Sequence, residues 1–396
     1  MNKMTIDDID PKGKRVMVRV DFNVPLDSSL HVTDDTRIQA ALPTILSLMN
    51  RGGRVILMSH LGRPKGKVNE DFRLAPAAHR LADLLGKPVL ALKDCIGDEV
   101  KAAVNAMKDG DVVMLENLRF HPEEEANDPE FCKKLAELGE LYVNDAFGTA
   151  HRAHASTEGI TRFYQVNVAG YLMGKEMEYL DGALQNPGRP FLAILGGLKI
   201  SGKIDVIINL LEKVDGLLIG GAMAYTLLKV QGVDVGDSIV EVEKLDVAKE
   251  ALDAVKKKGV KFLLPTDHKA VKEVKEGEKS QVIASPSIPQ GLKGVDIGPA
   301  TVAAFKAEIA RAKTIVWNGP MGVFEIPDFA VGTMEIAKAV ADSGAVSVVG
   351  GGDSVSAVHQ AGVSERITHI STGGGASLEL LEGKVLPGMA ALTDKQ

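Results

Sequence analysis

The sequence predicts an α/β protein of two Rossmann-like domains, each with a parallel sheet flanked by helices. Short runs rich in β-branched residues alternate with longer amphipathic segments, which is typical of repeated βαβ units. The chain has 396 residues, more than one hydrophobic core usually serves. We therefore expect two sheets, one in each half of the chain.

The strands of the two halves end differently. In the first half the predicted strands end in polar residues, and they span 15–21, 54–60, 111–116 and 141–145. In the second half most end in glycine, and they span 191–195, 216–219, 261–264, 314–318, 347–349 and 367–371. Parallel strands bring their carboxyl ends to one edge, where open α/β sheets bind ligands. Each half is therefore expected to carry a site.

A helical linker is predicted between the halves. Residues 171–189 are charged and helix-forming until the breaker Asn186, Pro187 and Gly188. This pattern predicts a first domain at 1–172, a hinge helix and linker at 173–189, and a second domain at 190–378.

Composition excludes several classes of protein. Lys and Arg number 46 against 53 Asp and Glu, giving a net charge of -7, which disfavours a nucleic-acid or anionic-membrane surface. Cys95 and Cys132 are the only cysteines, so we expect buried, inert thiols, no disulfide framework and a reducing, cytoplasmic location. No run is long and apolar enough for a membrane span, and the acidic N-terminus does not resemble an export signal.

Basic and polar side chains follow separate strands of the first half. They are Asp21 and Asn23 after the first strand, His60 and Arg63 after the second, Arg119 after another, and Arg152 between His151 and His154, while Arg37 opens a helix after Asp34, Asp35 and Thr36. Guanidinium groups grip carboxylate and phosphate oxygens bidentately. Their convergence predicts a pocket for a small, multiply anionic molecule.

Simpler explanations exist for each of these residues. One arginine after a strand is more often a solvated loop residue, but five or more at strand ends favour a site. His151 and His154 suggest a metal site, yet no Cys or Glu lies at zinc-ligand spacing. Orientation of the neighbouring arginine is the favoured role of these histidines.

Glycine-rich turns follow the strands of the second half. They lie at 219–223, 317–325, 349–354 and 371–379, and together they suit a nucleotide. Each alone is explained as a tight βα turn. Asp353, after three glycines, is either a helix N-cap or a magnesium ligand, and Mg²⁺ prefers carboxylates combined with phosphate oxygens.

The segment GGLKISGK at 196–203 places two lysines beside a glycine turn directly after a strand. Backbone N–H groups of such a turn approach anions closely, and the helix that follows adds its positive dipole end. Gly197, Gly202 and Lys203 fit part of the P-loop pattern, but Ile204 stands where a Ser or Thr should hold magnesium. A true P-loop is therefore not expected.

Taken together, these segments resemble the phosphoglycerate kinase family over essentially the whole chain. The matching segments, in the family's order, are RVDFNVP, SHLGRP, LENLRF, AHRAH, GGLK, WNGPMGVFE, GGGDS and STGGGASLE. The resemblance implies a glycolytic phosphotransferase with a carboxyl group as acceptor. It would reversibly transfer the acyl phosphate of 1,3-bisphosphoglycerate to ADP with Mg²⁺, giving 3-phosphoglycerate and ATP, in a bilobal monomer.

The resemblance also implies roles for individual residues. Phosphoglycerate would contact Asp21, Phe22, Asn23, Arg37, His60, Leu61, Gly62, Arg63, Arg119 and Arg152. The nucleotide would contact Lys203, Gly220, Gly221, Asn318, Glu325, Gly351, Gly352, Asp353 and Ser354, with Asp353 on magnesium. The C-terminal segment 379–396 would return to the first domain. Leu198 and Gly202 depart from the family's usual residues. The flexibility of this loop and its affinity for the nucleotide could therefore differ from those of the family.

Phosphoryl transfer depends mainly on in-line positioning and on positive charge around the transferring group. We assign that charge to Arg37 and Lys199, with the backbone N–H groups of Gly374 and Gly375 at a helix start. No general base is needed, because the attacking oxygen is already anionic. Arg37 and Lys199 lie in different halves, so domain closure is expected, and it would also exclude water.

Two other function classes remain open on the sequence alone. A nicotinamide dehydrogenase would share the fold, but no strand is followed by G-x-G-x-x-G with an acidic residue beyond it. A non-catalytic binding module would explain the anion pocket. It would not explain two lysines facing a second, glycine-lined site.

Overall fold

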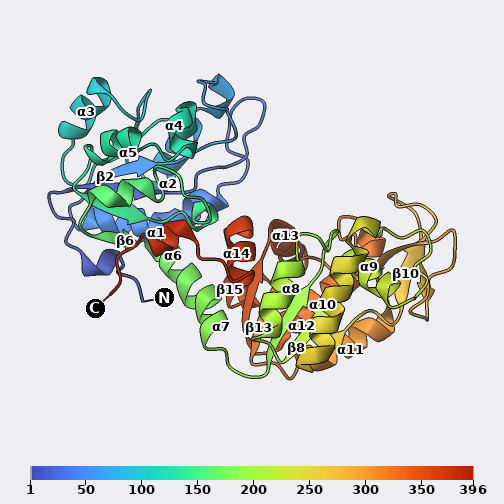
Figure 1. The fold of residues 1–396 in the computed structure, drawn as a ribbon. Coiled ribbons are helices and arrows are strands. Elements are labelled where there is room, and N and C mark those ends of the chain that lie inside the picture. The colour runs from blue at the N-terminus through green and yellow to red at the C-terminus, as the bar shows by residue number, and fades with distance from the viewer. Residues whose placement is uncertain (1, 396) are drawn as a thin grey trace. The chain divides into compact units, whose positions relative to one another are not determined.

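The computed structural model describes residues 2–395, which form two compact units (Figure 1). Unit 1 contains the described residues up to Glu178 and those from Val385 onward, and unit 2 is Tyr179–Lys384. Each unit has a six-stranded parallel sheet with helices on both faces. The predicted fold class is confirmed.

The sheet of unit 1 has the strand order β3-β4-β2-β1-β5-β6, and all its pairs are parallel. Its strands are β1 (Arg15–Arg19), β2 (Arg54–Met58), β3 (Val89–Ala91), β4 (Val112–Met114), β5 (Leu141–Asn144) and β6 (Asn167–Ala169). The four predicted strands are confirmed. The two edge strands, β3 and β6, were not predicted, because they are defined by tertiary pairing that a local pattern does not reveal.

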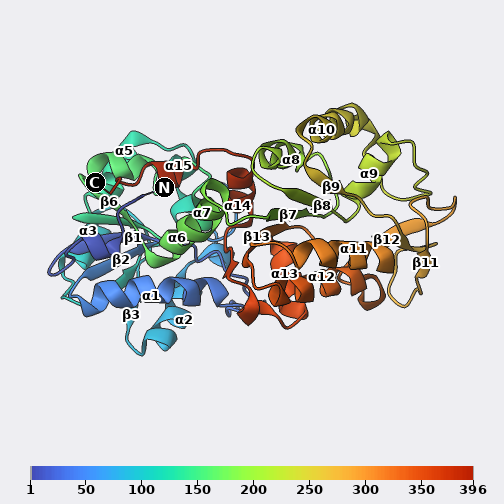
Figure 2. The same cartoon turned by 90° about the horizontal axis from the view of Figure 1, so that it is seen from below.

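Helices cover both faces of this sheet, with α1 and α2 on one side and α5 on the other (Figure 2). Helix α6 lies against α1, where the amide of Tyr171 donates to the Thr44 hydroxyl at 2.9 Å. The helices are α1 (Thr36–Asn50), α2 (Ala75–Leu85), α3 (Asp98–Asn105), α4 (Pro122–Glu125), α5 (Pro129–Ala136), α6 (Tyr171–Glu176) and α15 (Pro387–Ala390). Single 3₁₀ turns lie at Ile6–Asp8, Glu70–Phe72, Leu118–Phe120, Phe147–Thr149 and Gly159–Phe163.

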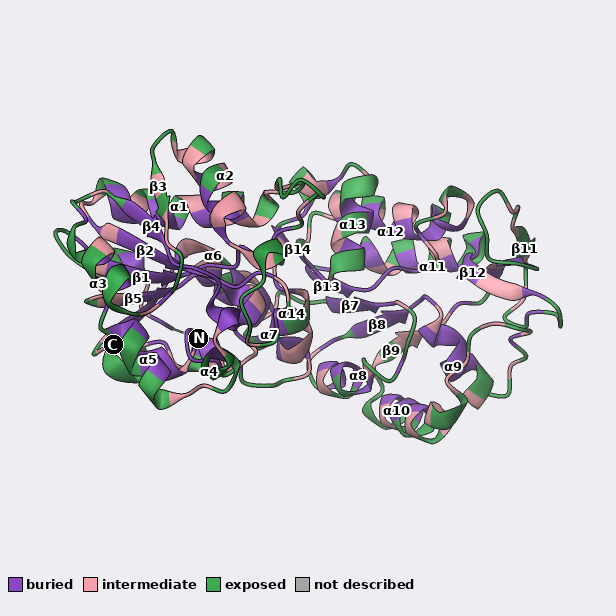
Figure 3. Ribbon diagram, turned by 90° about the horizontal axis from the view of Figure 1, so that it is seen from above, coloured by how far each residue is buried: buried purple, intermediate pink, exposed green. Residues whose placement is uncertain are grey.

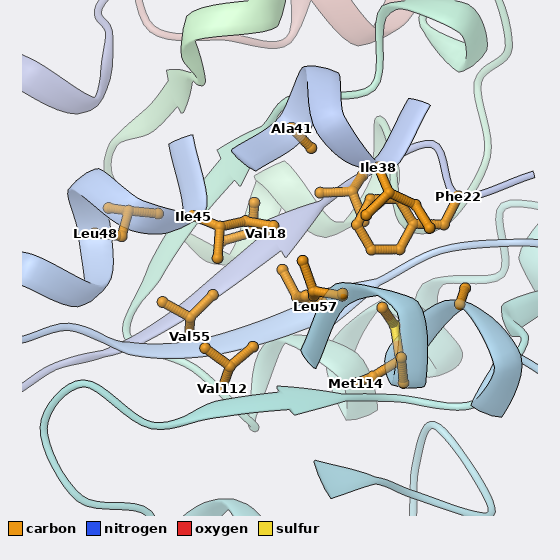
Figure 4. Packing of buried hydrophobic residues seen from close by; sticks show 14 of the residues in the cluster. Val18, Phe22, Ile38, Ala41, Ile45, Leu48, Val55, Leu57, Val112 and Met114 are labelled. Carbon is orange, nitrogen blue, oxygen red and sulfur yellow. The ribbon is translucent and has the colours of Figure 1, made fainter. Parts of the chain in front are cut away.

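Helical periodicity explains how α1 packs. Its apolar residues at positions 38, 41, 45 and 48 recur at a spacing of three or four, so they form one stripe on the helix. Figure 4 shows this stripe facing Val18, Val55 and Leu57 of the strands beneath. These residues are all buried, and burial of such side chains contributes roughly 1.5–3 kcal/mol each.

The sheet of unit 2 has the order β15-β14-β13-β7-β8-β9 and is also parallel. Its strands are β7 (Phe191–Leu195), β8 (Gly216–Ile219), β9 (Lys261–Leu263), β13 (Thr314–Asn318), β14 (Val346–Gly350) and β15 (His369–Ile370). All six correspond to predicted strands. The central strands are buried, as Figure 3 shows, which is why they are nearly continuous apolar runs.

Helices again cover both faces, with α8 and α10 on one side and α11 and α12 on the other (Figure 2). The helices are α7 (Gly182–Gln185), α8 (Ile204–Leu211), α9 (Met223–Val230), α10 (Leu245–Lys258), α11 (Pro299–Ile309), α12 (Val331–Asp342), α13 (Gly352–Gln360) and α14 (Gly374–Leu381). A π-helical turn spans Met177–Asp181, and 3₁₀ turns lie at Val242–Lys244, Pro327–Phe329 and Ser364–Arg366. Among the described residues, no helix is both long and apolar enough to cross a membrane.

Unit 2 also holds a small antiparallel sheet that the sequence analysis did not predict. Its order is β11-β10-β12, with β10 (His268–Val271), β11 (Gln281–Ile283) and β12 (Lys293–Ile297). It packs on its own apolar cluster, which includes Tyr225 of α9 and Ile288. Antiparallel strands need to bury only one face, so they lack the long apolar runs that revealed the parallel strands.

The C-terminal segment returns to unit 1, as predicted. The amide of Met4 donates to the carbonyl of Thr393 at 2.9 Å, and the amide of Thr393 donates to the carbonyl of Asn167, also at 2.9 Å. Lys3 forms an ion pair with Asp394 at 2.8 Å. The end of α14 stays in unit 2, where the Asn209 amide donates to the carbonyl of Leu381 at 2.7 Å.

Candidate active site

The polar residues predicted in unit 1 follow neighbouring parallel strands. Asp21 and Asn23 follow β1, His60 follows β2, and Arg119 lies on the 3₁₀ turn after β4. Since β4, β2 and β1 are adjacent in the sheet, their carboxyl ends meet at one edge.

Hydrogen bonds connect the loops at this edge. Arg37, on the first turn of α1, pairs with Asp21 at 2.9 Å. The Asn23 Oδ1 atom accepts the amide of Gly62 at 2.9 Å, and Arg119 donates to the carbonyl of Gly62 at 3.0 Å. Gly62 has φ +61, and a Cβ there would overlap the ring of Phe72. Only glycine allows this close approach.

His60 lies where positive charges converge. Burial lowers the pKa of His60 well below its usual range, and the charges of Arg19, Arg119, Arg37 and Arg152 lower that pKa further. The imidazole is therefore neutral near pH 7. Because Arg19 can only donate, its contact at 3.2 Å makes Nδ1 of His60 the acceptor and leaves the ring proton on Nε2.

Arg19 is a charged residue that the sequence analysis missed. It is only 1% exposed, and its Nε donates to Ser156 at 2.8 Å. The Ser156 hydroxyl in turn donates to Oε1 of the buried Glu124, at a distance of 2.5 Å. The sequence did carry one signal for Arg19, which is an arginine inside an otherwise apolar strand. Because a buried charge requires partners, this pattern indicates a buried polar network.

Arg152 and Arg63 differ in their surroundings. Arg152 Nε donates to the Nε2 atom of His151 at 3.1 Å, as expected for a histidine that orients its neighbour. Arg63 has an exposed side chain.

The histidines of this segment do not form a metal cluster. Within residues 2–395 the one candidate group of three metal-ligating side chains is Asp94, Cys95 and His121, whose ligand atoms lie within 4.8 Å of one another. His121 is already paired with Asp94 at 2.7 Å, and burial raises the pKa of the Cys95 thiol well above its usual range. Cys95 and Cys132 are both free and buried, as predicted.

In unit 2, Lys203 occupies the position directly before α8, and its side chain makes no capping bond to the helix. Its Nζ donates to the carbonyl of Asn318 at 2.8 Å and to the Asn318 side-chain oxygen. Burial lowers the pKa of Lys203 to about 8, although the charge of Asp353 acts in the opposite direction. Lys199, four residues earlier, is exposed.

Glycine is required where the turns after β7, β8 and β13 approach one another. A Cβ on Gly196 would overlap the carbonyl of Pro320, and a Cβ on Gly319 would overlap the carbonyl of Gly196. Gly221 has φ +68, and its Cβ would lie 2.5 Å from the amide nitrogen of Gly197. A Cβ on Gly202, in contrast, would have no neighbour within 4 Å.

Two helix N-termini meet beside these turns. Helix α13 begins at Gly352 and α14 at Gly374, and a Cβ on Gly374 would lie 3.6 Å from both Gly351 Cα and Gly352 N. The exposed Asp353 lies in the first turn of α13. Converging N–H groups and two dipole ends make this corner suitable for phosphate.

Ser354 and Asn318 hold the turns together. The Ser354 hydroxyl accepts the amide of Gly319 at 2.5 Å and is buried. The Asn318 side chain donates to the carbonyl of Gly350 at 3.0 Å. The Ser354 hydroxyl thus has a partner inside the protein.

A pocket of about 280 Å³ opens next to this corner. Its lining includes the predicted residues Gly221, Glu325 and Asp353. It also includes Leu198, Tyr225 and Met321. Tyr225 and Met321 were not predicted, because a tyrosine in an amphipathic helix and a methionine in a turn give no local signal of a ligand.

Comparison with known proteins identifies the family. The family model described as phosphoglycerate kinase matches residues 6–384. The chain belongs to the phosphoglycerate kinase family. It is 61% identical to the phosphoglycerate kinase of Chlorobium limicola and 59% identical to that of Chlorobaculum tepidum, with 100% of each chain covered.

Solved structures of the family have the same fold. The structure of phosphoglycerate kinase from Coxiella burnetii matches with a TM-score of 0.90 and 41% identity, covering 98% of each chain. That from Pyrococcus horikoshii matches with a TM-score of 0.85 and 35% identity, again over 98% of each chain. The chain is thus a glycolytic kinase that reversibly transfers a phosphoryl group from 1,3-bisphosphoglycerate to ADP. A dehydrogenase and a non-catalytic binding module are both excluded.

Proposed function

We propose that the two units divide the substrates of this reaction between them. Unit 1, predicted as the domain at 1–172, binds phosphoglycerate, and unit 2, predicted as the domain at 190–378, binds the nucleotide. The observation that carries the proposal is the convergence of four arginine charges on His60, because a neutral, buried imidazole among cations suits an anionic ligand.

The phosphoglycerate site consists of the loops joined at Gly62. Asp21, Asn23 and Arg119 fix the geometry through the contacts to Arg37 and Gly62. The remaining residues of the proposed site are Phe22, His60, Leu61, Arg63 and Arg152. Arg37 is held by one carboxylate and keeps further donors for a ligand, since a guanidinium group has five N–H donors.

The nucleotide site consists of the pocket and the adjoining corner of unit 2. Lys203, Gly351, Gly352 and the start of α13 would contact phosphates, and Gly220, Gly221, Asn318 and Glu325 would lie nearer the nucleoside. The exposed carboxylate of Asp353, which lines the pocket, fits a magnesium ion, since Mg²⁺ takes one or two carboxylates together with phosphate oxygens. When bound, the ion would neutralise phosphate charge.

Phosphoryl transfer requires positive charge around the phosphoryl group in the transition state. Lys199 and Arg37 supply this charge, and the N–H groups of Gly374 and Gly375 at the start of α14 add two neutral donors. The attacking oxygen is a phosphate or carboxylate anion, so no residue has to remove a proton. Since Arg37 and Lys199 belong to different units, we propose that closure brings the substrates together and excludes water.

We further propose that the chain works as a cytoplasmic monomer. Two buried free thiols suit a reducing compartment, and both substrate sites are assigned to residues of a single chain.

Titration calorimetry with each ligand alone tests the division of substrates. Arg63→Ala is expected to weaken 3-phosphoglycerate binding by about 1.5–3 kcal/mol, as for a lost charge-assisted hydrogen bond, and to leave ADP binding nearly unchanged. Lys203→Ala is expected to show the opposite selectivity. Arg162→Ala, which removes an exposed arginine that pairs with Glu158, is the control. Equal loss of both affinities in Arg63→Ala would contradict the two-site assignment.

A further inference from the structure

Glu241 makes contacts that fix residues 196–203, here called the lysine turn. Its carboxylate accepts the amide of Ser201 at 3.0 Å and the hydroxyl of Ser201 at 2.6 Å. Ser201 lies between Lys199 and Lys203, so these two bonds hold the middle of the turn. A carboxylate that accepts from both groups of one residue restrains that residue's position and orientation.

The backbone of Glu241 is itself anchored. Its amide donates to the Thr226 hydroxyl at 3.1 Å, and Thr226 is a buried residue of α9. Helix α9 begins directly after the turn of Gly220 and Gly221, which borders the nucleotide pocket. Glu241 therefore links the lysine turn to the helix that starts at the pocket.

Lys199 lies between two fixed points of the chain. On one side, the amide of Gly197 donates to the carbonyl of Pro320 at 2.9 Å. On the other side, Ser201 is held by Glu241. The side chain of Lys199 is exposed, so these backbone anchors restrict where its ammonium group can reach.

Charge also connects Glu241 with Lys199. Partial burial alone would raise the pKa of Glu241, but the hydrogen bonds from Ser201 and Ile200 and the charge of Lys199 outweigh burial and lower it. Glu241 is therefore an anion near pH 7, and it lies close enough to Lys199 for the two charges to attract each other.

We propose that Glu241 is a positioning residue for Lys199: it fixes Ser201 and balances the ammonium charge, so that Lys199 is held ready for the transferring phosphoryl group. This inference rests on the proposed role of Lys199. Glu241 touches neither substrate in this scheme. Loss of the Glu241 carboxylate should therefore slow phosphoryl transfer, the step in which Lys199 acts. It should change the binding of either substrate much less.

The test combines kinetics with hydrogen exchange in the full-length protein. Glu241→Gln keeps the shape of the side chain but removes its charge. We expect kcat to fall about tenfold, with KM for ATP and for 3-phosphoglycerate nearly unchanged, and exchange of the Ser201 amide to become faster. Glu243→Gln removes an exposed carboxylate two residues away and is the matched control. It is expected to leave kcat, both KM values and the exchange of the Ser201 amide unchanged.

A double-mutant cycle with Lys199→Ala shows whether Glu241 acts through Lys199. If it does, Glu241→Gln lowers kcat in the wild-type background but has little further effect in Lys199→Ala. An unchanged kcat in Glu241→Gln, or an equal fold-loss in both backgrounds, would overturn the inference. A near-normal kcat of Lys199→Ala alone would instead contradict the role proposed for Lys199, which distinguishes the two failures.

Discussion

At the scale of single residues, the two units create their charged sites in different ways. In unit 1, buried and partly buried arginines surround His60, and burial keeps the imidazole neutral. In unit 2, Lys203 is held by Asn318 while Lys199 and Asp353 remain exposed. We propose that the first arrangement binds an anion. In the second, we propose that the exposed cation and carboxylate bind a nucleotide with its metal ion.

Asp353→Asn tests the magnesium site. A neutral amide is a poor ligand for a hard dication, so we expect the variant to fold normally but to need a much higher magnesium concentration for half-maximal rate. The measurement is a steady-state magnesium titration at fixed ATP and 3-phosphoglycerate. Asp246→Asn, which changes an exposed carboxylate in the first turn of α10, is the matched control. An unchanged rate at every magnesium concentration would contradict the magnesium role and leave Asp353 only as an acidic residue in the first turn of α13.

Sequence reasoning worked for residues whose neighbours in the chain carried the signal. Lys203 and Asp353 stand out because they follow glycine turns at strand ends. Arg19 and Tyr225 were missed, because their importance comes from partners distant in the chain: Arg19 binds Ser156, and Tyr225 lines a pocket with Met321. Glu241 was missed for the same reason, since its partner Ser201 is 40 residues away.

At the scale of elements, the start of α6 depends on one buried carboxylate. Asp145 follows β5, and its Oδ1 accepts the amides of Leu172 and Met173 at 2.9 and 3.2 Å. A Cβ on Gly170 would overlap this carboxylate, so glycine is needed there. Burial raises the pKa of Asp145 to about 6, against the lowering effect of Thr44 and the two amides.

This raised pKa predicts a pH dependence of stability. Near pH 7 the folded protein bears the cost of a buried charge at Asp145, whereas the unfolded chain does not. As the pH falls from about 6 toward the unfolded value of 3.8, the folded form takes up a proton and the cost disappears. Relative to Asp145→Asn, the wild type should therefore gain stability on acidification, by up to about 3 kcal/mol.

The measurement is the thermal midpoint of both proteins at several pH values between about 4 and 7, as linkage requires. The wild-type midpoint minus that of Asp145→Asn should rise by several degrees as the pH falls. Asp128→Asn, which changes the capping aspartate of α5, controls for loss of a capping carboxylate. A difference that stays constant, or falls, on acidification would contradict the raised pKa.

Strands that form continuous apolar runs were predicted with their bounds, whereas strands defined mainly by tertiary pairing were missed. The strands β7, β8 and β13 have the predicted bounds, because buried parallel strands are continuous apolar segments. The strands β3 and β6 and the small antiparallel sheet depend on tertiary pairing, which a local pattern does not reveal.

At the scale of the whole molecule, the proposed mechanism uses charges from both units. Arg37 belongs to unit 1 and Lys199 to unit 2, and each unit has its own core and its own sheet. The chain length and the alternation of strand and helix patterns predicted two sheets, one in each half of the chain. The return of the C-terminus to unit 1 was implied by that resemblance alone, because residues 385–395 carry no local signal of their partner.

The central claim is that Lys199 stabilises the transferring phosphoryl group rather than the bound substrates. The most direct test is the steady-state kinetics of Lys199→Ala in a coupled assay with ATP and 3-phosphoglycerate that follows acyl phosphate formation. We predict a kcat lower by roughly 10²–10³-fold with KM changed far less, as for removal of one electrostatic stabiliser. Lys229→Ala, at an exposed lysine of α9, should remain normal. A near-normal kcat in Lys199→Ala, with circular dichroism confirming a folded protein, would contradict the claim.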